Sequence, residues 1–160
     1  MNSSPFILAT TIAALTLSHP AAAQAPPAWF GTWKLNVAKS VYNPGPPPYK
    51  RATYTIEPSQ DGVKVTYDLI HPRGGVTHLE WSGRFDGKDY AVQGLDQYVT
   101  YAYRPVGDGV YEVVVKIDDR VTGLSTISLS PDAKTMTTTT RGKGARGQDV
   151  STTTVYEKVR

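Results

Sequence analysis

Residues 29–50 read WFGTWKLNVAKSVYNPGPPPYK, and this stretch decides the fold because it begins as a strand and runs into a block of prolines. In a strand, successive side chains point to opposite faces. One face therefore carries Trp29, Gly31, Trp33 and Leu35, and we expect it to point inward. Gly31 would let a neighbouring backbone or a large indole approach closely. We expect Trp33 to be a buried structural side chain rather than a ligand contact.

Turn signals recur along the rest of the chain, and runs rich in β-branched and aromatic residues lie between them. Most intervals between these signals are 11 to 13 residues. Short strands at such spacing predict an all-β meander. No stretch after residue 23 keeps a helical period, so helix is expected only as one turn near residues 37–40. The expected strands are 29–36, 50–57, 62–70, 75–85, 89–93, 97–104, 109–117, 121–130, 133–140 and 150–159.

Composition chooses between a β-sandwich and a closed barrel. After residue 23 the chain holds 10 Tyr and 16 Thr but only 6 Leu and 4 Ile. A dry sandwich core needs more large aliphatic side chains, because their burial offsets the loss of chain entropy. Tyr buries a ring and keeps a hydroxyl that seeks a partner or water, which suits a partly wet lumen. We therefore predict an antiparallel up-and-down barrel of about 8–10 strands as a single domain over residues 24–160.

Three parts of the chain resemble a known superfamily. Gly31-Thr32-Trp33-Lys34-Leu35 resembles the first-strand signature of the lipocalin and fatty-acid-binding (calycin) superfamily. Residues 155–159, VYEKV, resemble the last strand of its fatty-acid-binding branch. The segments GTWKLNVAKSVYNPGPPP (31–48), DGKDY (86–90) and SPDAKT (130–135) resemble small exported bacterial lipocalin-like proteins, mostly without assigned function. The resemblance implies a lipocalin-like barrel whose lumen encloses one small ligand.

The chain departs from the fatty-acid-binding branch in two places. That branch covers its cavity with a helical pair, whereas prolines exclude a helix from residues 43–48. We expect an extended polyproline segment across a barrel mouth, which is either more open or capped by Tyr42 and Tyr49. The branch also commonly clamps a fatty carboxylate with an Arg two residues before the last-strand Tyr. Here Thr154 precedes Tyr156, so a fatty acid held in that way is not expected.

Residues 1–23 have the layout of a secretory signal peptide. An apolar run from Phe6 to Leu17 is followed by Pro20 and three alanines. The run is shorter than the ~20 residues needed to cross a bilayer, so no membrane span is expected after cleavage. We expect a periplasmic or secreted protein. Its 17 Lys and Arg are scattered among 14 acidic residues, so a nucleic-acid partner is not predicted.

His71 and His78 flank Gly74-Gly75 and are weak candidates for a metal site. A two-residue turn would pair the two imidazoles and add Glu80 on the same face. A three-residue loop over 73–75 would instead leave His78 and Glu80 in solvent. It would gather apolar side chains on one face, namely Val65, Tyr67, Leu69, Leu79, Trp81 and Phe85. The second register is favoured because register follows the side that can be buried. No metal or other cofactor is therefore predicted.

The more apolar faces of the strands supply the candidate ligand-binding residues. These are Tyr67, Leu69, Trp81, Tyr101, Tyr103, Tyr111, Val113 and Tyr156. A half-apolar wall with several hydroxyls is typical of a small-molecule pocket. The alternative is that the rings pack on one another and fill the barrel. The chain has no Cys, Gly-x-Ser-x-Gly or phosphate-binding loop, so no catalytic residue is predicted.

Three functions remain open. The first is non-catalytic binding of a small hydrophobic, amphipathic or aromatic molecule by a monomer or weak homo-oligomer. The second is an isomerase- or cyclase-like enzyme that performs acid–base chemistry in the same lumen. The third is an envelope protein-interaction module that uses the proline segment and an exposed strand edge.

Overall fold

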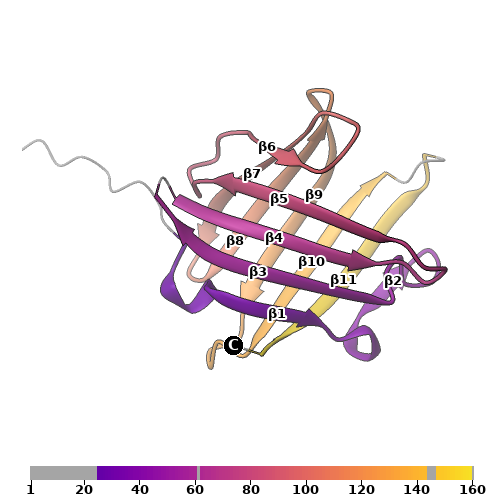
Figure 1. Cartoon of the computed structure of the whole chain (residues 1–160), viewed down its shortest axis with the longest axis horizontal. Helices are drawn as coiled ribbons and strands as arrows, with labels where there is room; N and C mark the ends of the chain where they lie inside the picture. The colour runs from indigo at the N-terminus through magenta and orange to yellow at the C-terminus, as the bar shows by residue number, and fades with distance from the viewer. Residues whose placement is uncertain (1–24, 61, 144–146, 160) are drawn as a thin grey trace, which may run out of the picture.

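The computed structural model describes residues 25–60, 62–143 and 147–159, which form one antiparallel sheet curled into a barrel (Figure 1). The predicted signal peptide, residues 1–23, lies outside the described residues. The strands are β1 (Gly31–Leu35), β2 (Val41–Asn43), β3 (Arg51–Ser59), β4 (Gly62–Ile70), β5 (Val76–Gly83), β6 (Tyr90–Gln93), β7 (Val99–Gly107), β8 (Val110–Ile117), β9 (Arg120–Leu129), β10 (Thr135–Lys143) and β11 (Asp149–Lys158).

The sheet closes because β1 pairs with β3 on one side and with β11 on the other. From β3 to β11, each strand pairs with its neighbour in sequence. β1 and β2 both pair with β11, at Trp33↔Lys158 to Leu35↔Tyr156 and at Val41↔Thr153 to Asn43↔Ser151. They follow each other along that strand and share one position in the wall, so the eleven strands form a ten-strand barrel. The predicted all-β, antiparallel up-and-down barrel is confirmed.

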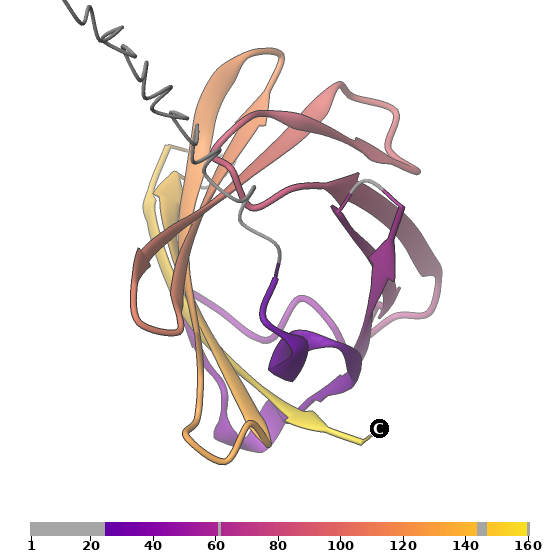
Figure 2. The same cartoon turned by 90° about the vertical axis from the view of Figure 1, so that its left-hand side faces the viewer.

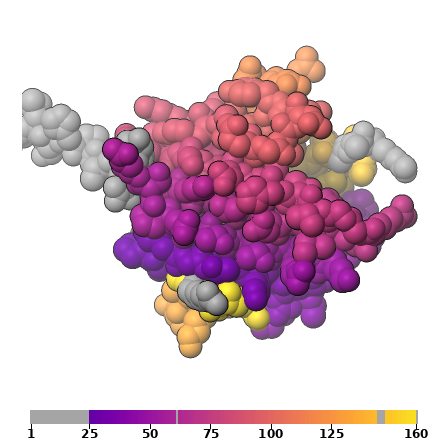
Figure 3. Space-filling view, viewed as in Figure 1, coloured from indigo at the N-terminus to yellow at the C-terminus, as the bar shows by residue number. Residues whose placement is uncertain are grey.

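Strand β4 shows how the sequence chooses the inside of the barrel. Val63, Val65, Tyr67 and Leu69 are buried, whereas the side chains between them are half-buried or exposed. The adjacent strand β5, which pairs with β4, buries Leu79 and Trp81 in the same way. The outer face of β1, β3, β4 and β5 forms a continuous surface of side chains (Figure 3).

The β4–β5 connection corrects one detail of the sequence prediction. Ile70 pairs with Val76, so the loop has the five residues 71–75 rather than three. Gly74 and Gly75 both take positive φ there, 93° and 87°. The predicted face is nevertheless right, because a shift of two residues returns every side chain to the same side of a sheet. The alternation alone could not distinguish these two registers.

Helical structure in the described residues is limited to two short 3₁₀ turns, η1 (Pro27–Trp29) and η2 (Val37–Lys39). Turn η2 lies where one helical turn was expected. Among the residues that the structure describes, no helix is long and apolar enough to cross a membrane.

The proline segment takes the place of a helical lid, but it is not a continuous polyproline helix as predicted. Its backbone bends at residues 44–46, 48 and 50. Gly45 has a φ of 100°, far from the value of about −75° that polyproline requires. The glycine therefore interrupts the extended run. The segment links β2 to β3 at the end of the barrel opposite η1 (Figure 1).

Candidate functional site

A cavity of about 350 Å³ lies inside the barrel, at the end where the proline segment connects β2 to β3. The inward positions of ten strands, all except β6, and the proline segment form its wall. Among the described residues that line it, seven are Tyr, five are Ser or Thr, and none is charged. The cavity is therefore bounded by rings, hydroxyls and aliphatic groups.

Strands β9, β10 and β11 form one side of the cavity, which we call the hydroxyl wall. Its members are Ser125, Thr138, Thr140, Thr152 and Thr154. Ser125 Oγ and Thr140 Oγ1 are 2.8 Å apart in a hydrogen bond. Thr154 Oγ1 donates to the backbone carbonyl of Thr138 at 3.4 Å, while Thr138 Oγ1 has no hydrogen-bond partner among the described residues.

The hydroxyl wall was not predicted from the sequence, although the strand pattern contains a signal for it. Met136 and Tyr156 are buried and directly paired. Counting by twos from these anchors puts Thr138 and Thr154, and then Thr140 and Thr152, on the inner face. Thr is also a good strand former on solvated faces, so its frequency alone did not reveal the wall.

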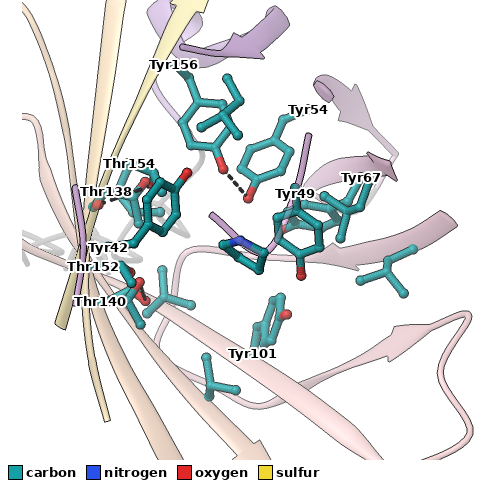
Figure 4. A pocket seen from close by; sticks show the side chains of 18 of the residues that line it. Tyr42, Tyr49, Tyr54, Tyr67, Tyr101, Thr138, Thr140, Thr152, Thr154 and Tyr156 are labelled. Atoms are coloured by element: carbon teal, nitrogen blue, oxygen red, sulfur yellow. Dashed lines mark hydrogen bonds between the residues drawn. The ribbon is translucent and has the colours of Figure 1, made fainter. Parts of the chain in front are cut away.

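Tyrosines from β3, β4 and β7 face the hydroxyl wall across the cavity, and Tyr156 of β11 contacts them beside that wall (Figure 4). They are joined in hydrogen-bonded pairs. The hydroxyls of Tyr67 and Tyr103 are 2.9 Å apart, and Tyr156 donates to Tyr54 Oη at 2.7 Å. The rings of Tyr54 and Tyr67 meet edge to face at 4.7 Å, and those of Tyr54 and Tyr156 stack at 4.4 Å. These contacts hold the phenols as one connected surface.

Burial keeps these phenols protonated. It raises the pKa of Tyr156 to about 12 and that of Tyr101 to about 12. Burial likewise raises the pKa of Tyr54, Tyr67 and Tyr103 above the usual value for Tyr. The cause is that a phenolate loses its hydration in the barrel. At neutral pH the cavity therefore offers neutral hydroxyls rather than anions.

Tyr42, Pro48 and Tyr49 line the cavity at its mouth. Tyr42 is on β2, and its hydroxyl has no hydrogen-bond partner among the described residues. The Tyr49 ring lies 5.3 Å from the ring of His71, which comes from the β4–β5 loop. The expectation that Tyr42 and Tyr49 stand at a barrel mouth agrees with these positions.

Aromatic side chains fill the other end of the barrel, which we call the aromatic base. Trp29 packs edge to face on Tyr111 at 4.8 Å and on Phe85 at 5.5 Å, and Phe85 stacks on Tyr103 at 4.9 Å. Figure 2 looks onto this end, where η1 lies within the barrel opening. A space of only about 20 Å³ remains between the base and the cavity tyrosines. Trp33 is fully buried, and its Nε1 donates to the Trp29 carbonyl at 2.8 Å.

The eight candidate ligand-binding residues thus fall at two levels of the barrel. Six line the cavity, namely Tyr67, Leu69, Tyr101, Tyr103, Val113 and Tyr156. Tyr111 belongs to the aromatic base, and Trp81 is fully buried against Tyr103 at 4.6 Å. Neither lines the cavity. Both point inward as predicted, but alternation does not specify how deep along the barrel a side chain lies.

The weak metal-ligand candidates His71, His78 and Glu80 do not form a single site. His78 lies on the outside of the barrel, with Nδ1 2.8 Å from Asp68 and Nε2 3.6 Å from Glu80. The hydrogen bond to Asp68 raises the pKa of His78 above its usual value. His71 Nε2 is instead 2.9 Å from Thr77 Oγ1. The described residues contain no group of three His, Cys, Asp or Glu side chains placed to hold a metal ion.

Comparisons with known proteins give one distant structural neighbour. No family model and no curated protein matches the chain. Among solved structures, the chain is similar to the zebrafish ileal bile acid-binding protein complexed with cholic acid. The two share 15% sequence identity over 82% of this chain and 99% of that chain, with a TM-score of 0.48. A likeness this distant defines neither a family nor a ligand for this chain.

Proposed function

We propose that this protein binds a small hydrophobic or amphipathic molecule inside the barrel and does not transform it. The observation that carries the proposal is the cavity of about 350 Å³ behind Tyr42 and Tyr49. This volume falls within the range of about 300–1,000 Å³ that is usual for small-molecule pockets. Its wall combines aromatic and aliphatic groups with a few hydroxyls, which is the usual composition of such pockets.

The lining favours binding over catalysis. Acid–base catalysis is most efficient when the pKa of the catalytic group lies near the working pH. Tyr101 and Tyr156 have pKa values of about 12, and the described lining residues include no His, Asp, Glu, Lys or Arg. A proton acceptor matched to neutral pH is therefore missing from this set. The proline segment also contributes Pro48 and Tyr49 to the cavity, which supports a role in ligand binding over one in protein docking.

We further propose that binding takes place in the periplasm or outside the cell, as the composition of residues 1–23 predicts. Mass spectrometry of the protein from its native host would test this directly. The expected mass is that of a chain that begins at Gln24. Full-length protein in the cytoplasmic fraction would contradict the proposal.

Two neighbouring residues on β9 provide a test of the cavity. Ser125 faces the cavity and is 8% exposed, whereas Thr126 is exposed on the opposite face. Ser125→Phe would place a phenyl ring in the cavity and reduce the space left for a ligand. Thr126→Phe is the matched control. The ligand probe is N-phenyl-1-naphthylamine, a neutral dye whose fluorescence rises in apolar surroundings.

We expect saturable binding by the native protein and by Thr126→Phe, and at least a tenfold loss of affinity in Ser125→Phe. A tenfold loss corresponds to about 1.4 kcal/mol of binding free energy. Circular dichroism would verify that both variants are folded. Equal binding by folded Ser125→Phe and the native protein would show that the dye does not occupy the cavity and would contradict the proposal.

A further inference from the structure

We propose that the natural guest is an uncharged ring compound that carries hydroxyl or carbonyl groups along one edge. This inference rests on the proposed function and specifies the ligand class. In the bound state, the ring system would lie against the tyrosines, and its polar edge would face the hydroxyl wall. Three features of the cavity lead to this assignment.

The first feature is the absence of charge. None of the described residues that line the cavity is Lys, Arg, His, Asp or Glu. The ion pairs lie elsewhere, for example Lys39–Glu157, Lys64–Glu80 and Lys116–Asp89, whose side chains are 28–63% exposed. A buried carboxylate or sulfonate would lose its hydration without gaining a cation. The cavity therefore disfavours anions, and for the same reason it disfavours cations.

The second feature is that the cavity has two unlike sides. Tyr49, Tyr54, Tyr67 and Tyr101 lie on one side and the threonines on the other (Figure 4). The tyrosine hydroxyls of two pairs are already engaged with each other, which leaves their rings as packing surfaces. Flat ring systems pack well against such surfaces. A guest with one apolar face and one polar edge would match both sides.

The third feature is a pair of buried hydroxyls that need partners. Tyr42 Oη and Thr138 Oγ1 both belong to residues that line the cavity, and neither has a hydrogen-bond partner among the described residues. Tyr42 stands next to the hydroxyl wall in Figure 4. Buried polar groups in folded proteins are nearly always hydrogen-bonded. A hydroxyl or carbonyl oxygen on the guest would satisfy these two groups.

The charge preference can be tested with two dyes that share one skeleton. N-phenyl-1-naphthylamine is neutral, and 8-anilinonaphthalene-1-sulfonate adds a sulfonate to the same ring system. We expect the native protein to bind the neutral dye at least tenfold more tightly. Binding of both dyes within threefold would overturn the inference while leaving the proposed function intact. Binding of neither dye would contradict the proposed function itself.

The absence of charge in the cavity also predicts that an added cation will reverse the preference for the neutral dye over the sulfonate. Thr154→Arg would place a cation in the hydroxyl wall and should tighten binding of the sulfonate at least tenfold, with weaker binding of the neutral dye. The control Thr126→Arg adds the same charge on the outer face of β9 and should change neither. If folded Thr154→Arg leaves the sulfonate affinity unchanged, the inference is wrong. If this variant does not fold, the comparison of the two dyes on the native protein still tests whether the cavity disfavours anions.

The polar edge requires a separate probe. 6-Propionyl-2-(dimethylamino)naphthalene is neutral and carries a carbonyl that accepts hydrogen bonds. The double variant Tyr42→Phe/Thr138→Val removes both unpaired hydroxyls and changes the cavity shape little. We expect it to bind the carbonyl dye at least fivefold more weakly and to bind N-phenyl-1-naphthylamine within twofold of the native protein. Equal effects on the two dyes, or no effect on either, would contradict the role of these hydroxyls.

Discussion

Raising the pH above 10 should unfold the barrel cooperatively, because the cavity phenols are buried in their neutral form. Tyr156 illustrates the size of the effect. It is 3% exposed, and burial raises its pKa from the usual 10.0 to about 12. Its contribution to stability is complete below the unfolded-state value and is lost as the pH rises through the folded-state value.

For Tyr156 alone, the difference in pKa corresponds to roughly 3 kcal/mol between its protonated and ionised states. The loss accrues at about 1.4 kcal/mol per pH unit in the window from about pH 10 to about pH 12. Four further cavity phenols have a raised pKa, namely Tyr54, Tyr67, Tyr101 and Tyr103. Since domains are usually stable by only about 5–15 kcal/mol, a few such groups suffice to unfold the barrel.

The assay follows phenolate absorbance and far-ultraviolet circular dichroism on the same samples as the pH is raised. The buried phenols should ionise together with the loss of strand signal. Tyr156→Phe should lower the slope of stability against pH by about 1.4 kcal/mol per pH unit. Gradual ionisation of all ten tyrosines in a folded protein would refute the reasoning.

Two further substitution tests concern stability. Tyr67→Phe and Tyr103→Phe should each lower the free energy of unfolding by about 1 kcal/mol, because each leaves a buried hydroxyl without its partner. The double variant should cost less than the two losses added together, and urea denaturation that gives strict additivity would contradict this. Gly94→Ala should cost at least about 2 kcal/mol, because its Cβ would lie 2.3 Å from a carbonyl oxygen of β5 at a φ of 93°. Gly45→Ala, with a φ of 100° and no atom within 4 Å, should cost about 1 kcal/mol; equal shifts of the thermal midpoint would exclude an effect of the close approach.

The inner face of each strand was predictable because burial and alternation act on every second residue. The apolar positions of β4 and β5 identified this face without any knowledge of the loop. The register of the β4–β5 pair could not be predicted in the same way, because a shift of two residues leaves the same face buried. Strand β2 was also missed, because it has only three residues and lies between η2 and the prolines.

Depth along the barrel was the main feature that the sequence did not specify. Tyr111 and Tyr103 lie on the inner faces of adjacent strands, yet Tyr111 packs against Trp29 while Tyr103 also reaches the cavity. Depth depends on strand tilt and register, which non-local pairing determines. The hydroxyl wall was missed for a different reason, because Thr has the same local preference for strands whether it faces a lumen or solvent.

The separation of the aromatic base from the hydroxyl wall has a consequence for evolution and engineering. The three tryptophans, Trp29, Trp33 and Trp81, are buried without lining the cavity. The threonines of β10 and β11 line the cavity without belonging to the aromatic base. Mutational libraries restricted to Thr138, Thr140, Thr152 and Thr154 would therefore vary the shape and polarity of the cavity on a scaffold whose aromatic base is left unchanged. Barrels that share an ancestor can come to prefer different ligands through substitutions at the same positions.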